Sequence, residues 1–216
     1  MAVLEIPIGD VVLEADLAIP DSPRGVVLFV HGSGSGRHSP RNRYVAGELQ
    51  AAGLITVLAD LLTSEEGRAD ARTAQLRFDI RLLAERVIGL TDWLADYGAT
   101  AALGLGYFGA STGAAAALIG AGARPHRVKA IVSRGGRPDL AGESLHLVRQ
   151  PTLLIVGGYD EVVIGLNRAA HKELAGEARL EIVPGAGHLF EEPGALEKVA
   201  RLACDWFTRH GQMSGQ

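Results

Sequence analysis

The sequence predicts an α/β fold whose core is a twisted, mostly parallel sheet of eight strands flanked by helices. Three observations lead to this prediction. Short, almost wholly apolar runs such as VVLFV and LLIV have the composition of strands that are buried on both faces. Clusters among the 28 glycines follow these runs directly, and helical patterns separate one run from the next. A strand, a tight turn and a helix together form the repeating unit of a parallel sheet.

The strands can be placed in order along the chain. Residues 2–8 and 11–19 alternate apolar and polar positions around Gly9-Asp10, which predicts an antiparallel hairpin at one edge of the sheet. Six later runs are apolar almost throughout, as strands buried on both faces must be. These predicted strands are 25–31, 54–59, 101–107, 128–133, 151–157 and 179–184.

Helical periodicity fills the intervals between the predicted strands, with apolar positions that recur at spacings of three and four. The predicted helices are 42–53, 70–97, 112–123, 161–176 and 193–210. Pro193 suits the first turn of the last of them. Residues 1–210 are expected to form a single domain, a size that one hydrophobic core supports. Residues 211–216 are expected to be a disordered tail.

The composition excludes several classes of protein. The 216 residues carry a formal net charge of −4, and a chain without a basic excess is not expected to bind nucleic acid. No apolar run approaches the roughly 20 residues of a membrane span, so no membrane partner is expected. The single cysteine excludes an intrachain disulfide, and the acidic, alternating N-terminus is unlike a targeting segment. We therefore expect a cytoplasmic protein.

Nothing in the sequence points to a cofactor. Residues 104–109 spell G-x-G-x-x-G, the dinucleotide fingerprint, but no acidic residue stands about 20 positions further on to hold a ribose. A phosphate-binding loop of the form G-x-x-x-x-G-K-[ST] is absent, and no histidine or carboxylate pair has the spacing of a zinc site. The expected chemistry therefore uses neither a cofactor nor a metal.

A serine nucleophile is predicted at Ser111, the centre of the G-x-S-x-G motif formed by residues 109–113. The motif follows an apolar strand and opens an alanine-rich helix, so it lies at a strand-to-helix turn. Such a turn holds the serine in a strained backbone conformation, and small neighbours avoid clashes there. The N–H groups at the start of the following helix also point toward developing negative charge.

A serine hydroxyl needs a base to take its proton and an acid to orient that base. His188 lies in the glycine-rich loop VPGAGHLF after the last apolar strand, where a catalytic base is expected. Asp160 follows LLIVGGY directly, at another strand end, and is the favoured acid. Asp139, in the loop after the preceding strand, is its rival.

Acyl transfer also needs N–H donors for the charge that develops on the carbonyl oxygen. Thr112, immediately after the predicted nucleophile, is one expected donor. The turn HGSGSG after the first parallel strand should supply the second, with Ser33 favoured and Gly34 close behind and expected to contact substrate. His31, at the start of this turn, is expected to be a structural hydrogen-bonding residue rather than a second base.

These segments together resemble the α/β-hydrolase superfamily. VVLFVHGSGSGRHSPRNR, GYFGASTGAAAAL, LLIVGGYD and VPGAGHLFEEPGAL stand in the family's order, and the similarity spans about residues 10–208. The chain is most similar to small dienelactone-hydrolase-like members. This resemblance implies the α/β-hydrolase fold and hydrolysis of carboxylic esters through an acyl-enzyme, with Ser111, Asp160 and His188 as a catalytic triad.

The chain departs from the family's pattern at two positions. Dienelactone hydrolases carry a cysteine where this chain has Ser111, which argues against dienelactone itself as the substrate. Similar chains commonly have a larger residue at the position of Gly187, so the loop that holds His188 is expected to be looser here.

The expected substrate is a small-molecule ester with a short chain. Only seventeen residues separate Ser133 from Pro151, where this fold commonly inserts a cap, and so short a segment cannot form a cap domain. Arg134 and Arg137 follow a strand whose end should border the site, and they are candidates to bind an acidic group of the substrate. Surface pairing of both arginines with neighbouring glutamates is at least as good an interpretation.

Two other functions stay open. Acyl transfer to a non-water acceptor, or cleavage of a thioester, would use the same triad. A non-catalytic, ligand-binding member of the fold is the other alternative, because a fold does not determine a function. The sequence also leaves the oligomeric state open, a homodimer included.

Overall fold

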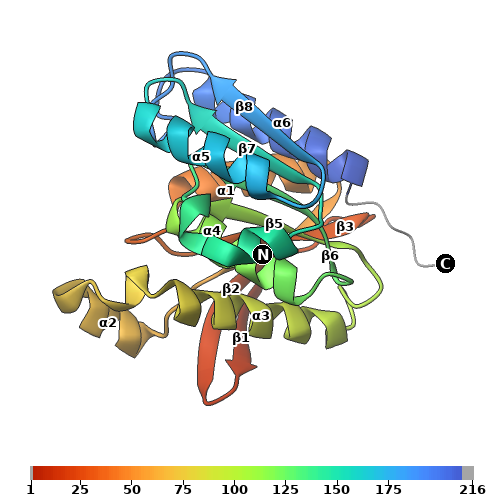
Figure 1. Ribbon diagram of the computed structural model, residues 1–216. Helices are drawn as coiled ribbons and strands as arrows, with labels where there is room; N and C mark the ends of the chain where they lie inside the picture. The colour runs from red at the N-terminus through yellow and green to blue at the C-terminus, as the bar shows by residue number, and fades with distance from the viewer. Residues whose placement is uncertain (1, 211–216) are drawn as a thin grey trace.

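The computed structural model describes residues 2–210, which contain one sheet of eight strands (Figure 1). The strands are β1 (Ala2–Ile8), β2 (Val11–Ala18), β3 (Gly25–Val30), β4 (Leu54–Ala59), β5 (Leu105–Ala110), β6 (Val128–Arg134), β7 (Thr152–Gly157) and β8 (Ala178–Val183). Their order in the sheet is β1-β2-β4-β3-β5-β6-β7-β8. In the hairpin β1–β2, strand β2 pairs with β4 in the antiparallel direction. The six strands β3 to β8 all run parallel to one another. The predicted fold class and edge hairpin are confirmed.

Helices cover both faces of the sheet, as Figure 1 shows. The helices are α1 (Pro40–Ala51), α2 (Ser64–Thr73), α3 (Ile80–Asp96), α4 (Thr112–Ala123), α5 (Glu161–Glu173) and α6 (Ala195–His210), with 3₁₀ segments η1 (Leu76–Phe78) and η2 (Pro138–Leu147). The apolar side chains of α3, α4 and α5 pack on one face, and those of α1 and α6 on the other. Every residue of β3, β4, β5 and β7 is buried, as expected of strands covered on two sides.

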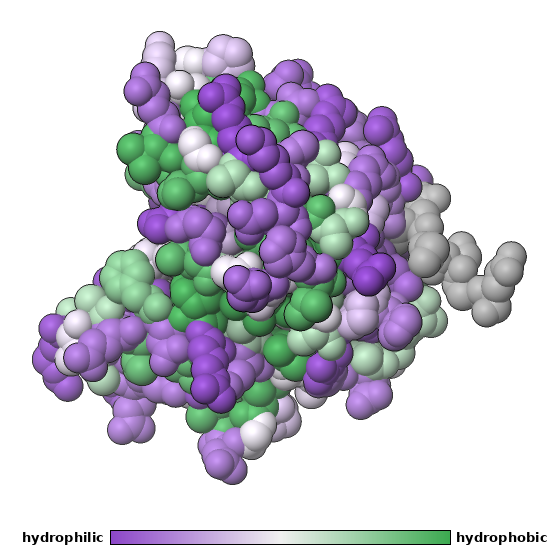
Figure 2. Space-filling model, in the orientation of Figure 1, coloured by the Kyte–Doolittle hydropathy of each residue, from purple (hydrophilic) through white to green (hydrophobic). Residues whose placement is uncertain are grey.

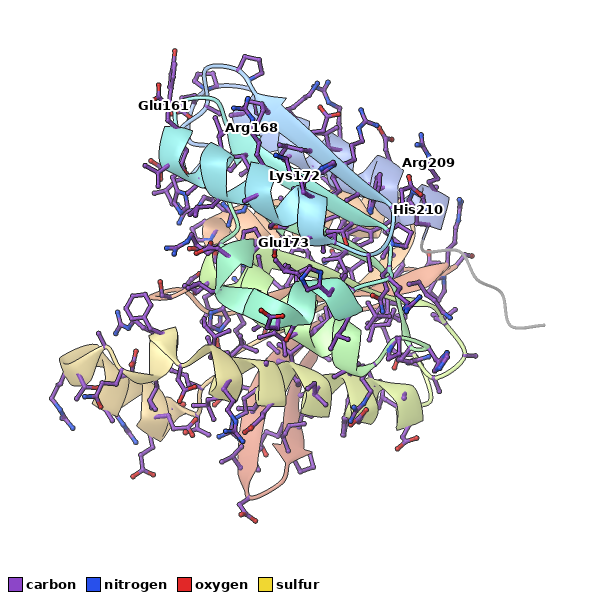
Figure 3. The ribbon with its side chains drawn as sticks, viewed as in Figure 1. Glu161, Arg168, Lys172, Glu173, Arg209 and His210 are labelled. Atoms are coloured by element: carbon purple, nitrogen blue, oxygen red, sulfur yellow. The ribbon has the colours of Figure 1, made fainter. Side chains whose placement is uncertain are left out.

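The outer helices are amphipathic. In α5 the buried positions are Val163, Asn167 and Ala170, at spacings of four and three. Figure 3 shows the charged side chains of Arg168 and Lys172 along the same helix, and both residues are exposed. The helix therefore packs one face on the sheet and turns its charges to solvent.

The single helix predicted over 70–97 is wrong, because two helices with a 3₁₀ turn between them occupy this region. The first helix, α2, ends at Thr73, and the next residue, Ala74, adopts the left-handed conformation. The buried Asp70 side chain accepts the backbone N–H of Leu76 at 2.8 Å and so draws the chain into a turn. Asp79 then caps α3. The apolar periodicity continues through this break, which explains why it predicts one long helix.

The strand predicted over 101–107 is displaced, since β5 spans Leu105–Ala110. Arg127 explains the shift because its guanidinium donates to the carbonyl oxygens of Ala101 and Leu103, each at 3.1 Å. These carbonyls are held in a turn and are not available to the sheet. As a result β5 ends directly before Ser111, which lies between β5 and α4.

The remaining boundaries differ from the predicted ones by a few residues at most. The tail predicted to be disordered, 211–216, lies outside the described residues. Within residues 2–210, no helix has the length and hydropathy that a membrane span requires.

Candidate active site

Ser111 has the geometry of a strained strand-to-helix turn. Its φ is +50° and its ψ is −126°, a conformation that L-residues rarely adopt. Both glycines of the motif are required by close packing. A Cβ at Gly109 would lie 2.6 Å from the Cα of Ala114, and one at Gly113 would overlap the carbonyl oxygen of Val30. The motif is therefore fixed by tertiary packing, and strain of this kind is concentrated at functional sites.

The structure places Asp160 and His188 in contact. The Nδ1 atom of His188 lies 2.6 Å from Oδ2 of Asp160, and the two side chains come from the loops after β7 and β8. The Tyr159 N–H donates to the Ala186 carbonyl at 2.9 Å, and Gly157 leaves no room for a Cβ beneath the β8 loop. The two loops are thus bonded to each other, and because a carboxylate only accepts, the Nδ1 atom donates.

Asp139 does not contact His188. Its carboxylate accepts from Nε and Nη2 of Arg137 at 2.9 and 2.7 Å. The geometry therefore favours Asp160 as the partner of His188.

The loop that carries His188 is held by Glu192. The Gly187 N–H donates to Oε1 of Glu192 at 2.9 Å, and a Cβ at position 187 would lie 3.0 Å from the same oxygen. The expectation of a looser loop at Gly187 stays a prediction, and in the structure the Glu192 carboxylate lies beside the place where a larger side chain at position 187 would begin.

The turn after β3 lies against Ser111. A Cβ at Gly32 would lie 2.8 Å from the Cβ of Ser111, so only glycine permits this approach. The Ser33 N–H donates to Oγ1 of Thr112 at 2.9 Å, while the Thr112 N–H has no acceptor within residues 2–210. The structure thus brings the two predicted oxyanion donors together. One of them, the Ser33 N–H, is already hydrogen-bonded to the hydroxyl of Thr112.

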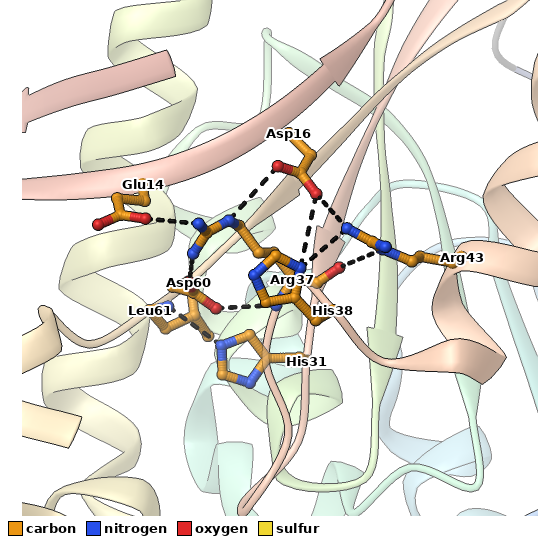
Figure 4. Close-up of polar contacts among 8 residues, drawn as sticks. All are labelled: Glu14, Asp16, His31, Arg37, His38, Arg43, Asp60 and Leu61. Atoms are coloured by element: carbon orange, nitrogen blue, oxygen red, sulfur yellow. Dashed lines mark hydrogen bonds and ion pairs between the residues drawn. The ribbon is translucent and has the colours of Figure 1, made fainter. Parts of the chain in front are cut away.

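A network of ion pairs around Arg37 holds the end of this turn (Figure 4). The Arg37 guanidinium pairs with Glu14 and Asp60, each at 2.5 Å, and lies 3.4 Å from buried Asp16. Its backbone N–H also donates to Asp60 at 2.8 Å. Several partly buried charges bonded together restrain a loop more firmly than one exposed pair. Arg37 therefore ties the end of the turn to β2 and β4.

His31 anchors the other end of the turn and does not act on Ser111. Its Nε2 accepts the N–H of Leu61 at 3.1 Å (Figure 4). Its Nδ1 lies 3.0 Å from the carbonyl oxygen of Gly32. The ring is therefore a neutral imidazole that donates through Nδ1. Burial lowers the pKa of His31 below its usual value of 6.5.

This lowered pKa predicts acid destabilisation. Between the folded and the unfolded pKa, the unfolded chain binds more protons, so the free energy of unfolding falls as pH drops below about 6.5. The slope from one proton approaches about 1.4 kcal/mol per pH unit. We expect urea unfolding at pH 5.5 and 7.5 to show a smaller difference for His31→Gln than for the wild type. The exposed-histidine control, His126→Gln, should keep the wild-type difference, and an unchanged difference in His31→Gln would contradict the assignment.

Ser111 and His188 line a common cavity of about 230 Å³ at the carboxyl end of the sheet. Its other lining residues are Gly32, Ser33, Ser35, Arg41, Ala110, Arg134 and Leu189. A second cavity of about 250 Å³, which includes Gly34, Asp60, Asp70 and Arg77, lies across the turn and shares Gly32, Ser33 and Ser35 with the first. Figure 2 shows the molecule indented on the left, between the start of α5 and α2.

Of the three predicted substrate-binding residues, Arg134, Gly34 and Arg137, only Arg134 lines the cavity beside Ser111. Arg134 lines it together with Ser111, whereas Gly34 lines the second cavity. Arg137 lines neither and is paired with Asp139. Sequence reasoning missed Arg41, which reaches the cavity from α1. Arg41 lies within the segment VVLFVHGSGSGRHSPRNR, but nothing in that segment marks it as a site residue, because the packing of α1 on β4 and α6 brings it to the cavity.

The chain is similar to curated proteins over almost its whole length. No protein family model matches it. Two curated proteins, from the CDC 1551 and H37Rv strains of Mycobacterium tuberculosis and both named "Putative phosphoribosyl transferase", are 57% identical over 207 residues. The match covers 96% of this chain but 46% of each relative, so the chain spans about half of their length.

Solved structures are similar over nearly the whole chain. The dienelactone hydrolase of Anabaena variabilis is 57% identical with a TM-score of 0.95, and 97% of each chain is covered. Est1E of Butyrivibrio proteoclasticus has a TM-score of 0.81 at 14% identity, covering 97% of this chain and 98% of that one. The second similarity shows the fold alone, whereas the first extends to the sequence.

Proposed function

Because this chain belongs to the dienelactone hydrolase-like α/β hydrolases, we propose that it cleaves small carboxylic esters through an acyl-enzyme on Ser111. One observation carries the proposal. The strained Ser111 lines the same cavity as His188, and the Nδ1 atom of that imidazole lies 2.6 Å from Oδ2 of Asp160. A nucleophile, a base and an orienting acid are the parts that acyl transfer uses.

In the proposed reaction, Nε2 of His188 takes the Ser111 proton as Oγ forms a bond to the ester carbonyl carbon. The oxyanion accepts from the Thr112 N–H and from the Ser33 N–H, which leaves the hydroxyl of Thr112. The C–O bond to the alcohol then breaks, and the imidazolium gives its proton to the departing oxygen. Water repeats the sequence on the acyl-enzyme and releases the carboxylic acid and free Ser111.

Labelling with a fluorophosphonate, followed by peptide mapping, tests the nucleophile directly. The probe is expected to modify the peptide that contains Ser111 and to block hydrolysis of p-nitrophenyl acetate in parallel. Modification of a different serine, or full activity after stoichiometric labelling of Ser111, would contradict the proposal.

Acyl transfer to another acceptor and thioester cleavage remain competing proposals, because they use the same three side chains. Product analysis with an added alcohol or thioester separates them from hydrolysis. The name of the mycobacterial relatives describes proteins about twice as long, and the chemistry around Ser111 supports acyl transfer rather than phosphoribosyl transfer. If the protein only binds a ligand, the probe should modify Ser111 but the unmodified protein should hydrolyse none of the esters tested.

Short acyl chains are the expected substrates. Between β6 and β7 the chain forms only the 3₁₀ segment η2, so no cap covers the cavity there. The second cavity has Leu62 and Leu83 in its lining, but the charged groups of Asp60, Asp70 and Arg77 beside them are poor partners for a long acyl chain. A buried methylene contributes about 0.8 kcal/mol only where an apolar wall covers it. The kcat/KM values of p-nitrophenyl esters should peak at about two to four acyl carbons, and a maximum at long chains would contradict this.

A further inference from the structure

The residue after the proposed nucleophile carries a buried hydroxyl that the proposed reaction does not use. Thr112 is 4% exposed and opens α4, directly after the strained Ser111. Its Oγ1 atom accepts the Ser33 N–H at 2.9 Å. This N–H is one of the two backbone donors expected for the oxyanion. The Thr112 hydroxyl therefore lies beside the place where negative charge develops in the proposed reaction.

The proton of this hydroxyl is an unused donor. A threonine hydroxyl can donate one hydrogen bond and can accept others at the same time. The Oγ1 atom of Thr112 accepts from Ser33, and within residues 2–210 its own proton has no acceptor. Buried donors are normally paired, so a buried hydroxyl proton beside a reacting group points to an acceptor that arrives with the substrate.

The start of α4 favours negative charge at the same place. Ser111 precedes the helix, yet its side chain accepts none of the N–H groups of the first turn. The Thr112 N–H also has no acceptor within residues 2–210. The partial positive charge of a helix N-terminus resides on such unpaired N–H groups. The backbone and the side chain of Thr112 thus both carry unused donors next to Ser111.

We propose that the Thr112 hydroxyl is a third donor to the oxyanion, beside the N–H groups of Ser33 and Thr112. The proposal rests on the proposed acyl transfer and adds one side chain to it. Oγ of Ser111 bonds to the carbonyl carbon, the electron pair of the C=O double bond moves to the carbonyl oxygen, and His188 holds the serine proton. The Ser33 N–H turns from Oγ1 to this oxygen, and the Thr112 hydroxyl then donates a hydrogen bond to it.

Electrostatics explains why the hydroxyl donates to the oxyanion rather than only releasing the Ser33 N–H. Oxyanion donors lie about 3 Å from the charged oxygen, and Oγ1 of Thr112 is 2.9 Å from the Ser33 nitrogen, so the oxyanion lies next to Oγ1. Lone pairs of the hydroxyl facing this charge would repel it. Rotation about the Cβ–Oγ1 bond moves only the hydrogen and replaces the repulsion by a charge-assisted hydrogen bond.

Thr112→Val tests the hydroxyl because valine keeps the branched side chain and removes the oxygen. With p-nitrophenyl acetate, kcat should fall by roughly 10²-fold, the effect of losing one oxyanion donor, while KM changes little. Thr112→Ser should restore most of kcat because it keeps the hydroxyl.

A hydroxyl that only pairs with the Ser33 N–H in the free protein gives the opposite result. Its removal would leave this N–H available to the oxyanion, so kcat of Thr112→Val would equal or exceed the wild-type value. That outcome would overturn the proposal. A crystal structure of Thr112→Val should show residues 32–35 unmoved against Ser111. A turn displaced from Ser111 would show that the hydroxyl acts by holding the turn, which would also overturn the proposal.

A transition-state analogue measures the same contact without turnover. The ketone 1,1,1-trifluorobutan-2-one is attacked by a serine Oγ, and its carbonyl oxygen then becomes an oxyanion. The dissociation constant of this adduct should rise in Thr112→Val by about the factor by which kcat falls, and Thr112→Ser should bind nearly as tightly as the wild type. Equal dissociation constants for the wild type and Thr112→Val would contradict the third donor.

Thr56→Val is the matched control. Thr56 is fully buried in β4, its hydroxyl accepts one hydrogen bond from Nε2 of Gln50 at 2.7 Å, and it lines neither cavity. Its variant should keep kcat and analogue binding, and an equal loss in both valine variants would overturn the proposal. A wild type that neither hydrolyses esters nor binds the analogue would remove the proposed function and the third donor together. An active wild type with an unaltered Thr112→Val would remove the third donor alone.

Discussion

Replacing Ser111 by alanine is expected to lower kcat for ester hydrolysis by a factor on the order of 10⁴ or more, with the fold intact. Loss of the nucleophile removes the acyl-enzyme route, and only binding and oxyanion stabilisation remain. The substitution introduces no new clash because alanine is smaller than serine. Its backbone must take the same φ of +50°, so the strain of the turn is unchanged.

The buried Ser133 provides a matched control for this prediction. It lies on β6, aligned with Gly109 of β5, and its hydroxyl has no hydrogen-bond partner within the described residues. Ser133→Ala should keep wild-type kcat, and both variants should keep the wild-type circular dichroism spectrum. Retained hydrolysis by pure Ser111→Ala, with kcat within ten-fold of the wild type, would show that another group performs the chemistry.

The fold follows from local sequence features that tertiary structure does not override. Apolar runs buried on two faces are short and continuous, which identifies strands such as β3 and β7 directly. The errors arise where a hydrogen bond from one side chain to the backbone fixes the local conformation. Arg127 holds the residues before β5 in a turn, and Asp70 breaks the helical region between α2 and α3. The periodicity of apolar residues along the chain carries no sign of either contact.

In the candidate site too, local sequence predicts some residues, and others depend on contacts in the folded chain. Ser111 comes directly after β5, and Asp160 and His188 lie in the loops that follow β7 and β8, so the parallel sheet alone brings all three to one edge. The supporting groups depend on side-chain contacts that form only in the folded chain. Glu192 accepts a hydrogen bond from the Gly187 N–H and so holds the loop of His188. Arg41, in the first turn of α1, reaches the cavity that Ser111 lines. Such contacts leave no pattern in the sequence.

Replacing Asp160 by asparagine should lower kcat by roughly 10³- to 10⁴-fold while preserving the fold. The carboxylate accepts the Nδ1 proton of His188 and so leaves Nε2 free to accept the proton of Ser111. A carboxamide can donate to Nδ1 instead, which stabilises the tautomer with its proton on Nε2. That tautomer cannot act as a base toward Ser111, so the loss should appear in kcat rather than in KM.

Asp139→Asn is the control because the same change is made to a carboxylate that follows the preceding strand. Asp139 accepts from Arg137 and has no contact with His188, so its variant should keep kcat within about three-fold of the wild type and lose only a modest surface pairing. Thermal unfolding of both variants separates catalytic from structural loss. If Asp139→Asn lowered kcat more than Asp160→Asn did, the acid of the site would be Asp139, and the 2.6 Å contact between Asp160 and His188 would serve only to join the loops after β7 and β8.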